Sequence, residues 1–310
     1  MPFAPFRRLV LLCMAAVGLL FAFPAKAAES TAFVAAPLYP GEHIVLDGQL
    51  SHPAWQRAPV HADFVERAPE LGAVPRQATS VQVLFDQTAL YVGIQAQDPD
   101  PSQIRAPLVR HDGVNRTQDF VAVYIDAIGQ RQSAQVFRVN AAGSTTDGMH
   151  TAVDDSEDAS PDFDFDAAVA RHANGYSVVL RIPFASLRYD TAGTPAWRMM
   201  VLRRVPREQF HQYTSVLIPR DAASFISVLQ PLQGLVLPAQ HQFLTLRPSL
   251  TVRTMSEHPP GQAAVRHNET EASLDLKWRI RSEWVVDGTW RPDFSQVALD
   301  VPQLTGNTRY

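Results

Sequence analysis

The sequence predicts an all-β fold, an antiparallel β-sandwich followed by a few long amphipathic strands. Apolar and polar residues alternate with a period of two through most of the chain, which is the pattern of strands with one buried face. Helical periodicity is scarce, and the 24 prolines are spread along the chain. Proline interrupts helices, so both observations favour sheets over helices.

The N-terminus has the pattern of a secretory signal peptide. Arg7 and Arg8 precede an apolar run at residues 9–23, and residues 25–27 offer a small-residue cleavage site. The run is short for a membrane span, which needs about 20 apolar residues. We therefore predict a signal peptide at residues 1–27, with an uncleaved anchor as the alternative. The mature protein is expected to be exported to the periplasm or outer membrane of a Gram-negative-type bacterium.

The charge of the mature chain argues against a nucleic-acid partner. Residues 1–27 hold three of the 27 basic residues and none of the 31 acidic ones, which leaves 24 against 31 and a formal charge of −7. Such a chain lacks the basic surface that nucleic acids require. Cys13, the only cysteine, lies in the same segment. We therefore expect a large core rather than disulfides to stabilise the fold.

Residues 28–240 are predicted to form the sandwich. Residues 79–97 have the pattern of a hairpin with its turn at residues 86–88. Residues 119–126 are almost wholly apolar, as in a central strand that is buried on both faces. Further strands are expected at residues 134–140, 166–172, 175–183 and 197–205.

Residues 241–310 differ in character from the sandwich. Strict alternation at residues 243–254, 270–280 and 284–290 predicts long strands with one apolar face. Strands of an outer-membrane barrel have this pattern, and a second soluble antiparallel sheet explains it equally well. A barrel needs at least about eight strands, so we expect incomplete barrel-like strands, in a fragment or a truncated product.

Five segments, taken together, resemble a known family. They begin with Ile-Val-Leu-Asp-Gly-Gln-Leu-Ser-His-Pro-Ala-Trp at residues 44–55 and continue at residues 83–94, 118–126, 135–140 and 175–184. In this order and spacing they resemble the family 9 carbohydrate-binding modules. The resemblance implies a non-catalytic β-sandwich that binds a glycan or oligosaccharide, with a role in glycan binding or polysaccharide breakdown.

A second resemblance concerns the C-terminal strands. Residues 274–278, Leu-Asp-Leu-Lys-Trp, are followed by Pro-Asp-Phe-Ser-Gln-Val at residues 292–297. They resemble the junction in a family of envelope proteins in which a sugar-module-like domain precedes an outer-membrane barrel. The resemblance implies that the C-terminal strands contact the outer membrane. A structural cap or plug for such a barrel, without sugar binding, is the alternative function.

Arg138 is the first candidate for sugar binding. It lies on the predicted strand 134–140, pointing away from Phe137 and Val139, and the resemblance matches it to a binding arginine. A guanidinium group suits two neighbouring hydroxyls. Asn140 is expected on the same face. The alternative is that Arg138 pairs with Asp119 across the sheet.

The resemblance also implies aromatic groups that clamp the ligand. The two clamp positions hold Asn115-Arg116-Thr117 and Phe225, and Ala122 stands where a partner acid is expected. The candidate carbohydrate-binding residues are therefore Arg138, Asn140, Asp119, Arg116 and Phe225. Two tryptophans, Trp55 and Trp197, are expected in the core.

An acidic run at residues 154–166 is a candidate metal-binding segment. Oxygen-rich loops bind calcium, and the resembled modules can carry structural calcium, so Asp154, Asp155 and Asp158 are calcium candidates. A solvated acidic loop is the alternative. The sequence contains no His-Glu-x-x-His, Gly-x-Ser-x-Gly or phosphate-loop motif, and no catalytic residue is predicted. An accessory domain of a glycoside hydrolase remains as a third function.

Overall fold

The computed structural model describes residues 31–189, 196–237, 243–257, 265–281 and 284–291. The predicted signal peptide and the predicted domain boundary at residue 240 lie outside these ranges. The described chain is built of strands with four short 3-10 helices: η1 (Pro53–Arg57), η2 (Pro101–Gln103), η3 (Phe184–Ser186) and η4 (Phe225–Val228). Within the described residues, no helix is long and apolar enough to cross a membrane.

One layer of the fold, sheet 1, has the strand order β1-β3-β4-β10-β9. Its strands are β1 (Phe33–Pro37), β3 (Thr79–Phe85), β4 (Ala89–Gln97), β9 (Asp166–His172) and β10 (Gly175–Pro183). The predicted hairpin at residues 79–97 is confirmed, since β3 and β4 pair in antiparallel register. Its turn is closed by Asp86, whose carboxylate accepts the backbone N–H groups of Thr88 and Ala89 at 2.6 and 2.8 Å.

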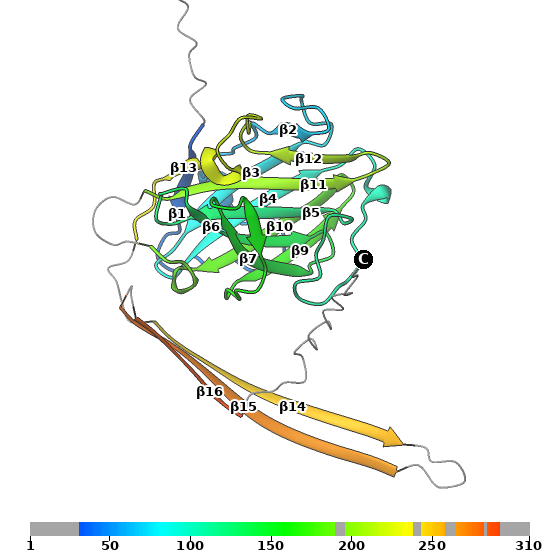
Figure 1. The fold of residues 1–310 in the computed structure, drawn as a ribbon, viewed down its shortest axis with the longest axis vertical. Coiled ribbons are helices and arrows are strands. Elements are labelled where there is room, and N and C mark those ends of the chain that lie inside the picture. The colour runs from blue at the N-terminus through cyan, green and yellow to red at the C-terminus, as the bar shows by residue number, and fades with distance from the viewer. Residues whose placement is uncertain (1–30, 190–195, 238–242, 258–264, 282–283, 292–310) are drawn as a thin grey trace, which may run out of the picture. The chain divides into compact units, whose positions relative to one another are not determined.

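The other layer, sheet 2, has the order β8-β7-β6-β5-β11-β13, with β12 paired to β11 and β2 to β12. Its strands are β2 (Val65–Ala68), β5 (Phe120–Asp126), β6 (Ser133–Asn140), β7 (Thr145–Thr151), β8 (Ser156–Asp158), β11 (Arg198–Pro206), β12 (Phe210–Thr214) and β13 (Gln230–Gln233). The predicted antiparallel pairing holds except at β1. This strand runs parallel to both β3 and β13 and so joins the two layers (Figure 1).

The main core lies between the two layers. On β5 the odd positions Val121, Val123 and Ile125 pack in this core. The even positions, among them Ala122 and Tyr124, pack in a second cluster on the outer face of sheet 2. Burial on both faces explains why the segment is apolar throughout, as predicted. Each fully buried large apolar side chain contributes about 1.5–3 kcal/mol to stability.

The tryptophans are core residues, as predicted. Trp55 and Trp197 are each 1% exposed. Trp55 lies on η1 and packs against the outer face of sheet 1 with Leu84 and Val179. Its ring lies so close to Gly93 that a Cβ atom there would be 2.8 Å from the ring atom Cζ3. The glycine is therefore required by close packing.

The C-terminal strands form a separate three-stranded antiparallel sheet of order β14-β15-β16. The strands are β14 (Phe243–Glu257), β15 (Val265–Arg281) and β16 (Trp284–Trp290). All three strand predictions in this region are confirmed. Alternation leaves Leu244, Leu246 and Leu250 exposed at 57%, 55% and 69%. Within the described residues this sheet is open, so a closed barrel stays a prediction.

Candidate functional site

Arg138 projects from the outer face of sheet 2, as alternation along its strand predicted. Phe137 and Val139 lie in the main core, and Arg138 is opposite Ala122 on β5. The small alanine leaves space for the long side chain. The Arg138 guanidinium lies 4.9 Å from the centre of the Phe120 ring and pairs with Glu157 on β8.

The alternative that Arg138 pairs with Asp119 is wrong. Asp119 has the same parity on its strand as Val121, which faces the main core, whereas Arg138 shares the outer face with Ala122. Asp119 instead binds Arg207, whose Nη1 lies 2.9 Å from Oδ2. The same carboxylate oxygen accepts the Arg105 backbone N–H at 2.7 Å. Glu157 takes the place of the expected partner acid of Arg138.

Asp119 is part of a buried charge network. Its side chain is fully buried, and Arg207 also donates to Asp98 Oδ2 at 2.6 Å. Arg203 is fully buried and lies 3.8 Å from the same Asp98 oxygen. Burial raises the pKa of the Asp119 carboxyl above its ordinary value, although Arg207 opposes the shift. The network therefore depends on Arg207 for its charge balance.

The side chain of Asn140 closes the turn after β6. Its carbonyl oxygen accepts the backbone N–H groups of Ala142 and Ser144 at 3.0 and 2.9 Å. Its amide donates to Pro107 O and to Gln118 Oε1, both at 2.9 Å. These four hydrogen bonds use the polar atoms of the buried Asn140 side chain within the protein.

Arg116 is exposed on the loop before β5. Its carbonyl oxygen accepts a bond from Arg204 Nε at 3.2 Å, and the Arg204 guanidinium lies 4.0 Å from the centre of the Phe210 ring. The charge of Arg116 helps to lower the pKa of Arg204, after burial as the main cause. Arg116 thus adds positive charge on the side of sheet 2 where β11 and β12 pair.

Phe225 lines a pocket of about 340 Å³ beside the outer face of sheet 2. Its ring lies 5.1 Å from Tyr124 and 5.4 Å from His150, measured between centroids. The Arg67 guanidinium lies 4.9 Å from the centre of the same ring. Asp155 Oδ1 accepts the Phe225 backbone N–H at 2.7 Å and so holds η4 against the sheet. The pocket is lined by Arg67, Ala68, Leu71, Asp155, Ile218, Pro219, Arg220, Ala222, Ser224 and Phe225.

Tyr124 links the pocket to Arg138. Its hydroxyl donates to Glu157 Oε2 at 3.3 Å, while its ring packs on Phe225. Burial raises the pKa of the Tyr124 phenol, which therefore stays protonated and able to donate. Arg138, Glu157, Tyr124 and Phe225 form what we call the outer-face cluster. It combines planar charged groups with aromatic carbon, a combination suited to a ligand with many hydroxyls.

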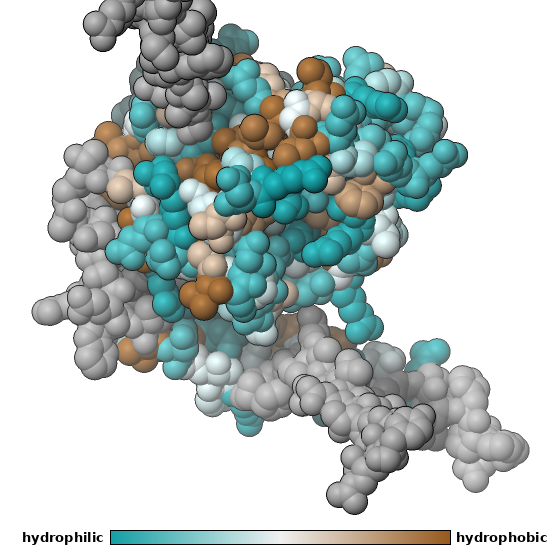
Figure 2. Space-filling view, turned by 45° about the horizontal axis from the view of Figure 1, so that its top comes forward, coloured by the Kyte–Doolittle hydropathy of each residue, from teal (hydrophilic) through white to brown (hydrophobic). Residues whose placement is uncertain are grey.

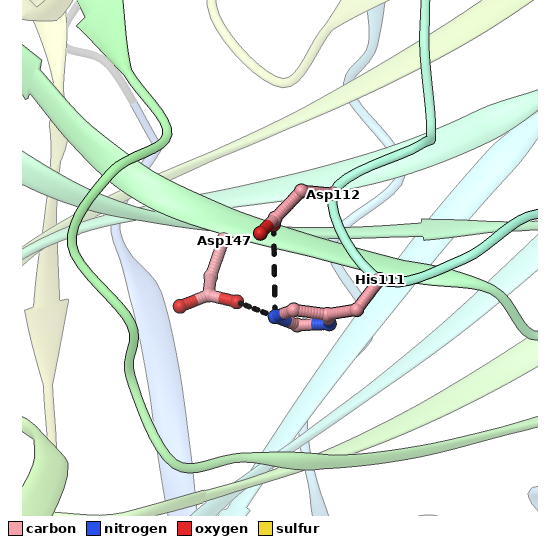
Figure 3. Close-up of side chains that lie close together, drawn as sticks. All are labelled: His111, Asp112 and Asp147. Carbon is pink, nitrogen blue, oxygen red and sulfur yellow. Dashed lines mark ion pairs between the residues drawn. The ribbon is translucent and has the colours of Figure 1, made fainter. Parts of the chain in front are cut away.

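The three calcium candidates are each bound locally. Asp154 accepts from Ser156 Oγ at 2.6 Å, and Asp158 accepts from Ser160 Oγ at 2.7 Å. Asp155 is 3.1 Å from His150 Nε2. In the part of the chain that the structure describes, a different group has its ligand atoms within 4.8 Å of one another: His111, Asp112 and Asp147 (Figure 3).

Sequence reasoning missed Glu157, Arg67 and Tyr124 as members of the site. Glu157 was visible only as part of the acidic run, because β8 is three residues long. Tyr124 lies in a strand buried on both faces, where no periodicity singles it out. The surface view shows apolar patches interrupted by hydrophilic side chains (Figure 2), as expected where such clusters meet solvent.

The sequence profile of the family described as carbohydrate family 9 binding domain-like matches residues 46–201. No curated protein matches the chain. A family 9 carbohydrate-binding module from Caldicellulosiruptor kristjanssonii, solved in complex with cellotriose, is similar at a TM-score of 0.48 and 16% identity, over 67% of this chain and 99% of that one. A family 9 module from the same organism in complex with glucose gives 0.47 and 15%, over 66% and 97%.

Proposed function

The chain belongs to the carbohydrate family 9 binding domain-like family, and from this premise we propose that its sandwich binds a carbohydrate and catalyses no reaction. The observation that carries the proposal is the outer-face cluster beside the 340 Å³ pocket. Arg138 and Glu157 offer planar groups for neighbouring hydroxyls. Phe225, which lines the pocket, offers aromatic carbon for the C–H face of a sugar ring, and Tyr124 packs against it.

The contacts suggest how a ligand is accommodated. Phe225 is 8% exposed, and Arg67 lies over its ring. A sugar seated on Phe225 displaces this guanidinium, which then donates to a hydroxyl. Arg138 and Glu157 are 15% and 24% exposed, so a second sugar unit reaches their polar atoms from solvent. The site therefore favours a chain end or a short oligosaccharide.

The test is a glycan array with the purified full chain, followed by calorimetric titration. Glucose and cellotriose, the ligands in the two Caldicellulosiruptor structures, are the first to titrate. Arg138→Ala and Phe225→Ala should each weaken binding at least about tenfold, the loss expected when one good charged or aromatic contact is removed. Titrations with calcium and with a chelator show whether a metal supports binding.

Arg181→Ala is the matched control. Arg181 is also an arginine on a strand, paired with Asp166 at 3.2 Å, but it lies on β10 of sheet 1. It should bind like the wild type. Wild-type affinity in the Arg138 and Phe225 variants would overturn the site. A folded protein that binds no glycan would overturn sugar binding.

A second candidate function is that of a structural domain that caps or plugs an outer-membrane barrel and binds no sugar. Two observations favour it. The side chains of Arg138, Asn140 and Asp119 each already have a partner within the protein. The sheet β14-β15-β16 also exposes a row of leucines, as strands facing lipid do.

For either function we propose export to the periplasm or outer membrane, with membrane contact through β14–β16. Vesicle flotation tests this contact. Leu246→Lys should reduce co-flotation, because a lysine facing lipid costs about 2–4 kcal/mol near the bilayer midplane. Ser249→Lys, on the other face of β14, is the control and should float like the wild type. Equal flotation of both variants, or none by the wild type, would contradict membrane contact.

A further inference from the structure

His111, Asp112 and Asp147 meet where the loop before β5 crosses β7 (Figure 3). His111 Nε2 lies 2.9 Å from Asp147 Oδ1 and 3.6 Å from Asp112 Oδ1. A third carboxylate, Asp162 on the loop before β9, has Oδ1 at 4.0 Å from the same nitrogen. The loop and β7 thus place three potential ligand atoms within 4.8 Å of one another, and the exposed Asp162 lies beside them.

Asp147 is the buried member of this group. Its side chain is 1% exposed. One oxygen, Oδ2, accepts the Phe163 backbone N–H, but Oδ1 is buried without a hydrogen-bond partner and points at His111. A buried carboxylate oxygen without a hydrogen-bond donor destabilises the fold. A positively charged partner at this oxygen would remove that cost.

The orientation of His111 determines what that partner can be. Nδ1 lies 3.1 Å from Thr145 Oγ1, and such a second contact fixes the ring and presents Nε2 as a ligand. If Nε2 carries a lone pair, it faces the Asp147 oxygen directly, and two lone pairs repel. A proton on Nε2 would satisfy one carboxylate. A divalent cation would satisfy Asp147, Asp112 and Asp162 together.

We propose that His111, Asp112 and Asp147, with the exposed Asp162 as a fourth ligand, bind a divalent transition metal of the zinc class. Ligand atoms about 2.0–2.1 Å from a tetrahedral zinc are about 3.3 Å apart, and the distances of 2.9, 3.6 and 4.0 Å bracket this value. Calcium takes six to eight oxygens, and an imidazole nitrogen in the ligand set favours zinc, copper, iron or nickel over calcium.

The metal would fasten the loop before β5 to β7. The loop is already anchored there by Asp112 N–H to Thr145 O at 3.1 Å. Its Val114 carbonyl accepts a bond from Arg138 Nη1 at 3.4 Å, so the same loop borders the outer-face cluster. The metal site itself stands on its own ligands and does not depend on sugar binding.

The test is calorimetric titration of the metal-free full chain with zinc chloride and, separately, calcium chloride. We expect one zinc per chain and at least tenfold weaker calcium binding. Cobalt should bind in place of zinc and give the intense visible absorption of a tetrahedral site. His111→Ala should weaken zinc binding at least about 100-fold, the upper loss known for groups that merely orient ligands.

Asp100→Asn is the matched control, since Asp100 is an exposed acid whose side chain bonds to Ser102 and Gln103 in its own turn. It should bind zinc like the wild type. Substitution of the buried Asp147 can unfold the protein, so the half-exposed His111 decides the outcome. No zinc binding, unchanged binding in His111→Ala, or calcium binding as tight as zinc would each overturn the proposal. None of these outcomes depends on whether the chain binds a glycan.

Discussion

Replacing Arg207 by alanine should destabilise the sandwich strongly. Arg207 donates to Asp119 at 2.9 Å and to Asp98 at 2.6 Å, and these carboxylate side chains are 0% and 2% exposed. Removal of one partner from a buried ion pair costs about 3–5 kcal/mol, because the other charge remains buried. Arg203, 3.8 Å from Asp98, still balances that carboxylate. Asp119 keeps the hydrogen bond from the Arg105 backbone but loses its charged partner, so we expect a loss of about 3 kcal/mol, near the lower limit.

The stability lost in Arg207→Ala should be larger at neutral pH than at acidic pH. Burial already raises the pKa of Asp119 in the folded protein, and without Arg207 this pKa rises further. A carboxyl whose folded pKa lies above its unfolded value of about 3.9 destabilises the fold when it is charged. The cost is therefore largest near pH 7. This cost decreases as the pH falls through the folded pKa of Asp119 towards about 4, because the carboxyl becomes protonated.

Urea unfolding of the wild type and Arg207→Ala at about pH 7 and about pH 4 measures both effects. Arg181→Ala is the control, because the Arg181–Asp166 pair is 32% and 59% exposed. Exposed pairs contribute under about 1 kcal/mol. The reasoning is refuted if Arg207→Ala costs no more than Arg181→Ala. It is also refuted if the loss in free energy of unfolding stays constant on acidification.

Three further substitutions probe the fold. Gly93→Ala places a Cβ 2.7 Å from Leu50 Cδ2 and 2.8 Å from Trp55 Cζ3, so urea unfolding should show a loss of about 1–3 kcal/mol from overpacking. Asn140→Ala removes four buried hydrogen bonds and should lower the thermal midpoint, at a cost of about 3 kcal/mol; an unchanged midpoint would contradict this. Burial raises the pKa of Asp86, but hydrogen bonds from its turn outweigh it and hold the pKa low. The stability lost in Asp86→Asn should thus be present above about pH 4 and vanish as the pH falls through the folded pKa, and a pH-independent difference would exclude this role.

Much of the fold could be predicted because strand periodicity is local. The hairpin at residues 79–97 and the three C-terminal strands lie where alternation placed them, and β5 lies where the continuous apolar run placed it. Strand β7, Thr-Thr-Asp-Gly-Met-His-Thr at residues 145–151, was missed because it is largely polar. It is a strand because β6 and β8 pair with its two edges, and that pairing is not visible in its own sequence.

The candidate site was predictable only in part. Alternation correctly directed Arg138 away from the core. Pairing with Asp119 was the alternative to sugar binding, yet Asp119 faces the core and Arg138 pairs with Glu157. Which acid pairs with Arg138 depends on the register of β5, β6 and β8. Loop closure and packing decide this register.

The sequence by itself therefore determined the all-β class, the positions of most strands and, in the strands that alternate, the face on which a side chain lies. These properties follow from the two-residue period of a strand, which needs no knowledge of distant residues. The tertiary structure decided which charges meet: Arg138 with Glu157, Asp119 with Arg207, His111 with Asp147. Such contacts require angstrom-scale placement of segments far apart in the chain, and only strand pairing and core packing supply it.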